Sequence, residues 1–449
     1  MVDLSTSRLL DFSTSRPLDD LPERLRLLTA VLHRLREDVD LAHGRLPAYI
    51  FSDPEVYERE LQAIFGRCWL CVGHVSEVPY NGDYVTRYMG TNPVVMVRGE
   101  DGQVRVILNV CQHRGMRVCR SELGNTSHFR CPYHGWTYKN DGRLVGVPFQ
   151  QQAYGEELDR SSIRLREARV EQYAGLVFAT WDTSAPSLGE YLGDARWYLD
   201  LYVGRAEMQV FGPPQRYEIP TNWKIPSENF ASDAYHTGHL HASISRLGLV
   251  PSTTFAESGY HVHAGNGHGV GLGMPSERSI FDPVVLPIFE QRLRPEQVDV
   301  LRQIKNMHCT IFPNLSFLIS SAILGGQIVS HTLMKQWTPK GPGRIEVLSW
   351  GLVEQAATPE WKDRSRQHYV LTFGPSGIFE QDDSETWMDI TRNCAAPAAR
   401  DQSFCYLQGF GRAPATDFPG PGEAYQSKYN ENNARAFYAR WLQLMTDGV

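Results

Sequence analysis

Two short stretches of the sequence each place a cysteine close to a histidine, and both are followed by glycine. In CQHRG, Cys111 stands two residues before His113, and in CPYHG, Cys131 stands three residues before His134. Seventeen residues separate the two pairs. A disulfide would not need the histidines, whereas thiolates and neutral imidazoles together are ligands for soft and borderline metals. The four side chains therefore predict a metal site.

The order of these ligands favours one kind of site. Two cysteines and two histidines can hold tetrahedral zinc, but a zinc finger groups its cysteines and its histidines separately. Here each Cys–His pair supplies one cysteine and one histidine, which suits a two-iron, two-sulfide cluster of the Rieske type. Gly115 and Gly135 let backbone N–H groups approach the sulfides, and Trp136 is placed to cover them. Zinc, or four unrelated core residues, are the alternatives.

A second group of ionisable residues lies in the stretch SENFASDAYHTGHLH, which ends at His241. It contains three histidines within six residues, which is dense for a surface helix and suits a transition metal. In a regular helix His236 and His239 face the same way, while His236 and His241 diverge. Gly238 allows a helix to loosen or end here, so spacing leaves both pairs open.

Composition and charge describe an ordinary globular protein and exclude several classes. Hydrophobic residues make up 42% and charged residues 21% of the chain. The net charge of -7 argues against nucleic acid as a partner, because phosphate binding needs a clustered positive field. Residues 1–20 contain acidic side chains and no apolar signal-peptide core, and no apolar run approaches the roughly 20 residues that span a bilayer. We therefore expect a cytoplasmic protein with no membrane partner.

The eight cysteines fit a reducing compartment, where they are more often core residues or metal ligands than disulfides. Cys68 and Cys71, in CWLC, have the spacing of a redox dithiol. They lack a Gly-Pro centre and continue into an apolar strand, so we interpret them as buried free thiols.

The sequence pattern along the chain changes from helical to strand-like and then to a mixture of both around the two candidate sites. Residues 1–20 read as a poorly ordered leader, and helical patterns follow from Pro22 and from Asp53, an N-cap before proline. From Trp69 to Trp181, short β-branched segments between turns predict an antiparallel β domain that carries both Cys–His pairs on loops. One pair of segments is a hairpin around Glu100, Asp101 and Gly102. Strands and helices then alternate up to a closing amphipathic helix.

Several longer motifs resemble the large (α) subunits of bacterial aromatic-ring-hydroxylating dioxygenases, of the naphthalene and biphenyl dioxygenase type. They are FGRCWLCVGHVSEVP, LNVCQHRG, CPYHGWTY, NWKIPSENFASDAYHTGHLH, TIFPNLSF and TFGPSGIFEQDD. The resemblance covers nearly everything after residue 50. It implies an α+β fold in which an antiparallel β Rieske domain, residues 68–186, is inserted into a larger catalytic domain. Residues 1–67 and 187–449 would form that domain, an antiparallel sheet flanked by helices in a helix-grip arrangement.

The resemblance also assigns metal ligands that spacing leaves open. A Rieske [2Fe-2S] cluster would be held by Cys111, His113, Cys131 and His134. A mononuclear Fe(II) would be held by His236, His241 and Asp383, the second aspartate of FEQDD, with Asp382 as the alternative. His239 stands where naphthalene dioxygenase carries tryptophan and is not counted as a ligand. Two histidines and one carboxylate leave open positions for dioxygen and substrate.

Asp233 is assigned a role between subunits. In the family, the matching aspartate links an iron-binding histidine, here His236, to a cluster histidine of the neighbouring subunit, here His134. Electrons would then cross between chains, which implies a ring of at least three α subunits, and the family type implies an α3β3 particle with a small β subunit. The sequence shows no flavin or nicotinamide fingerprint, so a separate ferredoxin and reductase would supply the electrons.

The residues that match the family's substrate cavity are mostly apolar or aromatic, which favours a flat hydrocarbon ring. They are Asn229, Phe230, Ala234, Thr237, His308, Leu318, Ser321, Phe373 and Phe379. None of these positions carries an arginine that would pair with a carboxylate. His308 falls where naphthalene dioxygenase carries asparagine.

Together these features predict a terminal oxygenase that uses O2 to cis-dihydroxylate an aromatic hydrocarbon, polycyclic or substituted. The alternative within enzymes is a Rieske monohydroxylase of an aromatic acid such as salicylate. The alternative outside the enzymes is a protein that only carries electrons, and it would leave the whole chain after Trp181 without a function.

Overall fold

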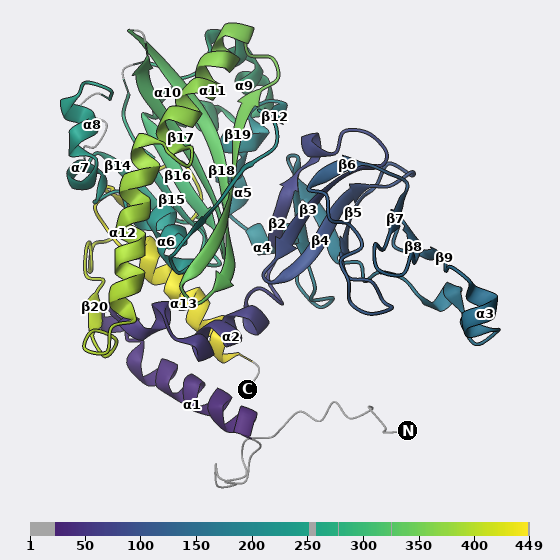
Figure 1. Ribbon diagram of the computed structural model, residues 1–449. Helices are drawn as coiled ribbons and strands as arrows, with labels where there is room; N and C mark the ends of the chain where they lie inside the picture. The colour runs from purple at the N-terminus through teal and green to yellow at the C-terminus, as the bar shows by residue number, and fades with distance from the viewer. Residues whose placement is uncertain (1–22, 251–256, 277, 325, 448–449) are drawn as a thin grey trace.

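The computed structural model describes residues 23–250, 257–276, 278–324 and 326–447. The predicted leader, residues 1–20, lies outside the described residues. Figure 1 shows a large body with a broad sheet and several helices, and a smaller β-rich part beside it. None of the described helices is long and apolar enough to cross a bilayer. The predicted α+β class, with an antiparallel β domain beside a helix-flanked antiparallel sheet, is confirmed.

The smaller part consists of ten short strands that pair antiparallel in three sheets, ordered β10-β11-β2, β5-β4-β3-β6 and β7-β8-β9. The strands are β2 (Leu70–His74), β3 (Asp83–Met89), β4 (Asn92–Arg98), β5 (Val104–Leu108), β6 (Leu123–Asn125), β7 (His128–Arg130), β8 (Thr137–Lys139), β9 (Leu144–Gly146), β10 (Arg169–Tyr173) and β11 (Leu176–Thr180). β4 and β5 form the predicted hairpin, with Arg98 opposite Val104.

Strand β4 shows why this part stays attached to the large body. Its side chains alternate between two faces, as strand geometry requires. Val94 and Met96 pack into the core that continues into the large body, whereas Val95 and Val97 pack into a second core around the two Cys–His loops. Both faces are therefore buried, and the strand reads as a continuous apolar run.

The large body is built on a nine-stranded antiparallel sheet. Its order is β12-β19-β18-β17-β16-β15-β14-β21, and β13 also pairs with β19. The strands are β12 (Met208–Val210), β13 (Gln215–Ile219), β14 (Gly259–His263), β15 (Gly269–Gly273), β16 (Asn306–Ile311), β17 (Leu315–Leu324), β18 (Gln327–Gly341), β19 (Arg344–Glu354) and β21 (Glu423–Gln426). β17 begins at Leu315 with the hydrophobic stretch LSFLIS.

Helices pack against this sheet and carry most of the second candidate site. α6 (Lys224–Ser232) contacts β15, β16 and β17, and α11 (Pro359–Phe373) contacts β18. α12 (Ile378–Cys394) packs beside α11, and the closing helix forms as predicted, as α13 (Asn432–Thr446). Further short elements are α3 (Gln150–Tyr154), α4 (Leu188–Leu192), α5 (Ala195–Leu199), α7 (Thr237–Leu240), α8 (Ala242–Arg246), α9 (Leu286–Arg292), α10 (Pro295–Gln303), and the pair β1 (Arg45–Pro47) and β20 (Ser403–Cys405).

The N-terminal helices α1 (Glu23–Asp38) and α2 (Pro54–Ala63) pack on the large body, against α13. The Asp53 side chain caps α2, as predicted. Glu60 of α2 is fully buried, where it pairs with Lys224 at 2.6 Å and accepts hydrogen bonds from the indole N–H groups of Trp223 and Trp441. These contacts join α2 to the large body. The division of the chain at residues 67 and 186 stays a prediction.

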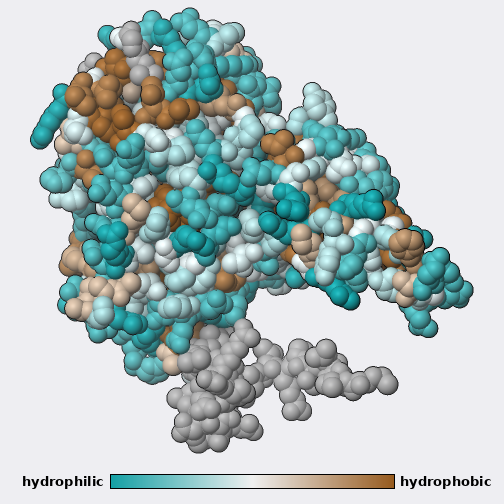
Figure 2. Space-filling view, in the orientation of Figure 1, coloured by the Kyte–Doolittle hydropathy of each residue, from teal (hydrophilic) through white to brown (hydrophobic). Residues whose placement is uncertain are grey.

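Hydrophobic residues gather on one region of the large body, over the end where α8 and β17 lie (Figure 2). Leu247, which follows α8, is 74% exposed, and Ile323 of β17 is 36% exposed. The Ile323 N–H donates to the carbonyl of Leu249 and joins the two segments. Because Val250 lines the cavity described below, this apolar surface adjoins it.

Candidate metal centres and substrate pocket

The two Cys–His stretches fold into two similar loops in the smaller part. In the first loop the Cys111 N–H donates to the Met116 carbonyl, and the Gly115 N–H donates to the Cys111 carbonyl. In the second loop the Cys131 N–H donates to the Trp136 carbonyl, and the Gly135 N–H donates to the Cys131 carbonyl. These distances are 2.8 to 3.0 Å. Gly115 and Gly135 have φ values of 74° and 75°, which residues other than glycine rarely adopt. The glycines are therefore needed to form the loops that present the two pairs.

The loops bring the four side chains together. The rings of His113 and His134 have centroids 4.5 Å apart, and Cys111 and Cys131 are each 2% exposed. The Nδ1 atoms of both histidines are buried and have no hydrogen-bond partner in the described part of the chain. Such orphaned atoms are costly unless they bind something. Two buried nitrogens and two buried thiols fit a cluster with two sulfur and two nitrogen ligands.

Aromatic side chains enclose this group. The Trp136 ring stacks on His113 at 4.9 Å with an interplanar angle of 7°, and Tyr138 Oη lies 3.4 Å from Cys111 Sγ. Burial and the neighbouring His134 lower the pKa of His113, so its imidazole is neutral near pH 7, the form that binds metals. Trp136, itself 5% exposed, covers the site as expected.

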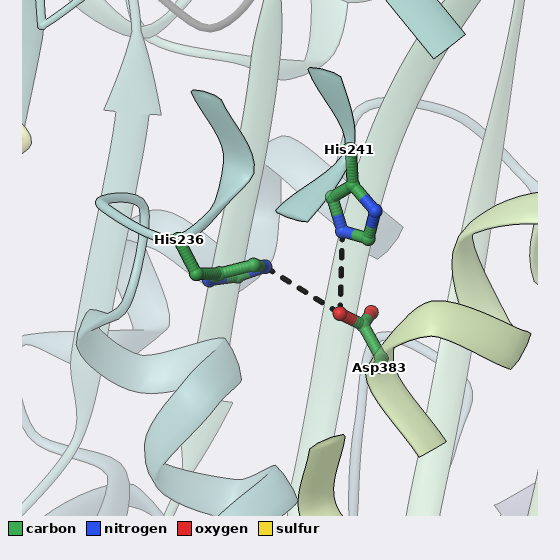
Figure 3. A group of neighbouring side chains, drawn as sticks. All are labelled: His236, His241 and Asp383. Carbon is green, nitrogen blue, oxygen red and sulfur yellow. Dashed lines mark ion pairs between the residues drawn. The ribbon is translucent and has the colours of Figure 1, made fainter. Parts of the chain in front are cut away.

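A second group forms where His236, His241 and Asp383 meet (Figure 3). The Nε2 atoms of His236 and His241 lie 3.5 and 3.2 Å from Asp383 Oδ1. The atoms that these three residues offer as ligands all lie within 4.8 Å of one another. Asp383 Oδ1 is buried and has no hydrogen-bond partner among the described residues. Two imidazole nitrogens and an unsatisfied carboxylate oxygen fit a divalent metal with open coordination positions.

A break between helices explains how histidines five residues apart converge. α6 ends before Asp233, whose φ of -96° and ψ of 86° turn the chain, and α7 begins only after His236. His241 separates α7 from α8. A continuous helix would have pointed His236 and His241 in different directions. His239 is exposed and lies outside the group, in agreement with its exclusion as a ligand.

The two neighbouring aspartates of α12 take different positions. Asp383 faces the Nε2 atoms of both histidines, while Asp382 Oδ2 lies 3.2 Å from His241 Nδ1. Asp382 thus contacts the opposite side of the imidazole and fixes its orientation. The geometry favours Asp383 over Asp382 as the residue that shares a metal with the histidines.

Asp233 is placed beside the same group. Its Oδ1 accepts a hydrogen bond from the His236 backbone N–H at 3.1 Å and lies 3.2 Å from the His236 ring Nδ1. Burial acts to lower the pKa of His236, but the carboxylates of Asp233 and Asp383 outweigh it and raise the pKa to about 9. The Asp233 side chain remains 41% exposed, so part of its carboxylate is open to a partner.

A pocket of about 90 Å³ opens on the His–His–Asp group, and all nine predicted pocket residues line it. Its floor comes from alternate residues of the sheet, Asn306 and His308 of β16 and Leu318 and Ser320 of β17. Its roof comes from α6, α7, α11 and α12. Residues that line the pocket but were not predicted are Val250, Asn306, Ser320 and Lys428.

Comparison with known proteins decides the family. Residues 188–447 match the family described as ring hydroxylating alpha subunit (catalytic domain), and residues 68–173 match the Rieske [2Fe-2S] domain. The chain belongs to the ring-hydroxylating alpha subunit family. It is an enzyme of the Rieske-type aromatic-ring-hydroxylating dioxygenases, as predicted, and it carries a Rieske [2Fe-2S] domain.

Similar proteins match this alpha subunit over nearly its whole length. Biphenyl 2,3-dioxygenase subunit alpha of Rhodococcus jostii (strain RHA1) is 38% identical, over 92% of this chain and 91% of that protein. Benzene 1,2-dioxygenase subunit alpha of Pseudomonas putida is 36% identical, over 90% and 91%. The structure of naphthalene 1,2-dioxygenase from Rhodococcus sp. bound to indole superposes with a TM-score of 0.87 and 43% identity, covering 94% of this chain and 98% of that one. As an alpha subunit, the protein works with further subunits and electron-transfer partners.

His308 has a fixed orientation in the pocket of this alpha subunit. Its Nδ1 lies 2.8 Å from the carbonyl of Phe230, to which the ring N–H donates. Burial lowers the pKa of His308 to about 4, so the ring is neutral. Gly271 stands opposite in the register, and a Cβ there would lie 2.1 Å from His308 Nε2. Only glycine leaves room for this ring.

Lys428, Asn306 and Ser320 are the polar lining residues that sequence reasoning missed. Lys428 follows β21, which pairs with β14 at the edge of the sheet, a contact between distant parts of the chain. The sequence around it, QSKYNEN, contains no spacing typical of a binding site. For Asn306, the strand alternation that places His308 in the pocket could have served as a signal, because the two residues share a face.

Proposed function

We propose that this alpha subunit is a terminal oxygenase that adds both atoms of O2 to adjacent carbons of an aromatic ring and releases a cis-dihydrodiol. One observation carries the proposal. The group of His236, His241 and Asp383 lies in the wall of the pocket, so a ring held there would meet the metal's open positions. The names of the relatives point to biphenyl, benzene and naphthalene as their substrates.

Two metal groups belong to this reaction. The cluster would be held by Cys111, His113, Cys131 and His134, and Fe(II) by His236, His241 and Asp383. When bound, the cluster stores and passes electrons, and the mononuclear iron activates dioxygen. The protein's part is to keep the ligands oriented: Asp382 holds the His241 ring, and Asp233 holds the His236 ring.

The pocket walls orient a flat ring and exclude water. Phe373 and Phe379 stack with ring centroids 5.1 Å apart and an interplanar angle of 6°, and both are less than 8% exposed. Phe230 and Leu318 line the same cavity. Apolar walls of this kind bind an aromatic ring by removing its surface from water.

Electrons reach the iron site from another subunit in this proposal. Figure 1 places the β7–β9 end of the Rieske part far from α6 and α12 within one chain. Asp233 has a partly open carboxylate, and the His134 side chain is only partly buried. A ring of three alpha subunits, completed as α3β3, would bring His134 of one chain to Asp233 of the next. A ferredoxin and a reductase would supply the electrons. None of the eight cysteines forms a disulfide, which suits the cytoplasm that we propose for the protein.

Turnover under labelled dioxygen tests the proposal. The alpha subunit, assembled with a β subunit and supplied with a ferredoxin and a reductase, is offered naphthalene and salicylate in separate reactions. A dihydrodiol of naphthalene with label in both oxygens is the expected product. A singly labelled phenol from salicylate alone would overturn the dioxygenase proposal in favour of the monohydroxylase.

A further inference from the structure

Lys428 is a buried lysine whose amine has no partner. It is 3% exposed and lines the pocket, yet no hydrogen bond or ion pair involves its Nζ in the part of the chain that the structure describes. The two other buried lysines differ: Lys224 pairs with Glu60 at 2.6 Å, and Lys335 pairs with Glu380. A buried ammonium normally has such a counter-ion, because desolvating an unpaired charge is expensive.

The backbone before Lys428 is held in a rare conformation. Ser427 has a φ of 86°, in the left-handed region that residues other than glycine rarely adopt. Three hydrogen bonds fix the turn: Ser427 N–H donates to the Gly259 carbonyl at 2.8 Å, Ser427 Oγ donates to Glu257 Oε1 at 2.7 Å, and Lys428 N–H donates to the Glu257 carbonyl at 2.9 Å. The position of Lys428 at the pocket is therefore set by the fold and not by a flexible tail.

The surroundings of Lys428 supply no negative charge for it. The acidic residues that line the pocket, Asp233 and Asp383, are engaged with the two histidines of the iron site. Burial and the nearby positive charge of Lys305 lower the pKa of Lys428 to about 8, so its amine is mostly charged at pH 7. The Lys428 charge in turn contributes to lowering the pKa of His308, which places that charge within reach of the cavity.

We propose that Lys428 binds an anionic oxygen substituent, such as a carboxylate, on the aromatic substrate. The ring would lie between the aromatic walls, and the substituent would accept a charge-assisted hydrogen bond from Nζ. This inference rests on the proposed oxygenase function and narrows its substrate class. It supplies the acid-binding group that the predicted pocket residues lacked.

Comparing the two naphthoate isomers with naphthalene separates the contribution of the carboxylate charge to binding from that of the aromatic ring. Holoenzyme with a β subunit, ferredoxin and reductase is assayed with each compound for the wild type, Lys428→Met, Lys428→Arg and the control Lys362→Met, at a lysine of α11 outside the pocket lining. For at least one naphthoate, the ratio of kcat/KM for naphthoate to that for naphthalene should fall at least about tenfold in Lys428→Met, the effect typical of a hydrogen bond to a charged group. Lys428→Arg should retain part of the preference, and Lys362→Met should keep the wild-type ratio. An unchanged ratio for both isomers in Lys428→Met overturns the inference.

Calorimetric titration of the oxidised holoenzyme with each naphthoate keeps the inference testable without turnover. If no aromatic compound is oxidised but a naphthoate binds the wild type at least about tenfold more tightly than Lys428→Met, the lysine site stands and the proposed reaction fails. If naphthalene is oxidised and both naphthoates bind wild type and Lys428→Met equally, the reaction stands and the lysine site fails. Circular dichroism confirms that the variants are folded.

Discussion

The carboxylates of Asp382 and Asp383 meet opposite nitrogens of the same imidazole. Asp383 Oδ1 lies 3.2 Å from His241 Nε2, and Asp382 Oδ2 lies 3.2 Å from His241 Nδ1. In the proposed site, two residues adjacent in sequence would therefore have different roles: Asp383 would share the metal with His241, and Asp382 would fix the orientation of the ring from its other side. The arrangement makes the two aspartates experimentally separable.

Asp383→Asn should lose the mononuclear iron and keep the cluster. Iron per alpha subunit is expected to fall by about one third while the visible absorption of the cluster persists, because one iron of three is lost. Activity should fall by more than about 100-fold, since even an outer partner of a metal ligand is worth about 10–100-fold. Iron analysis and absorption spectroscopy on the same preparation make the measurement.

Asp382→Asn is the matched control for that variant, at the neighbouring position. The amide oxygen can still accept a hydrogen bond from the His241 ring, so the iron should remain at excess metal and activity should fall by no more than about 10–100-fold. Loss of iron in Asp382→Asn with retention in Asp383→Asn would reverse the assignment of the two aspartates.

The predictability of each site follows from how local its residues are in the chain. The cluster loops were predictable from spacing, because each Cys–His pair and its glycine lie within five residues and form one turn. The choice of His241 over His239 was not, because it depends on the break after α6, where Asp233 leaves helical geometry. Asp383 lies more than a hundred residues from the histidines and was assigned only through family resemblance. Lys428 reaches the pocket through the pairing of β21 with β14, which no local pattern encodes.

Electron transfer between chains can be tested by mixing two inactive alpha subunits. Cys131→Ser should lack the cluster and keep the iron site, and Asp383→Asn should lack the iron site and keep the cluster. Rings assembled from equal amounts of both should recover roughly a quarter of wild-type turnover, because half the iron sites are intact and half of their neighbours carry a cluster.

The control for this mixing experiment is the same pair with Asp233→Asn added to the Cys131→Ser chain. Its iron site keeps the ligands but loses the carboxylate charge beside His236, so the recovered turnover should drop. Mixed rings that show no recovery at all, with both metals present by analysis, would mean that electrons pass within one chain.

Gly271→Ala should destabilise the catalytic domain through His308. A Cβ at this position would lie 2.1 Å from the ring Nε2, and the ring cannot retreat without breaking its hydrogen bond to Phe230. We expect a loss of about 1–3 kcal/mol in unfolding free energy, as for other overpacked sites. Gly341→Ala is the control, because nothing lies within 4 Å of a Cβ there. The double variant Gly271→Ala with His308→Ala should recover part of the loss in denaturant titrations, whereas a loss independent of residue 308 would contradict the steric account.

Binding of an anionic aromatic compound should weaken as the pH rises. The pKa of Lys428 is lowered to about 8 by burial and by Lys305, and only the protonated amine binds the anion, so the dissociation constant of a naphthoate should be flat below pH 8. Above that pH it should rise by up to about tenfold per unit, and it should level off only above the higher pKa that the ammonium has beside the bound anion. His308 and His261, whose pKa values are lowered to about 4 and about 3, stay neutral over this range, and Asp233, whose pKa is also lowered, stays ionised. Calorimetric titrations from pH 6.5 to about 9.5 on the oxidised holoenzyme measure how the dissociation constant changes with pH.

Two lysine variants are the controls. Lys428→Met should bind more weakly, with a dissociation constant that does not change with pH, and in Lys305→Met the dissociation constant should begin to rise at a higher pH. A pH dependence that survives in Lys428→Met would assign the titration to another group.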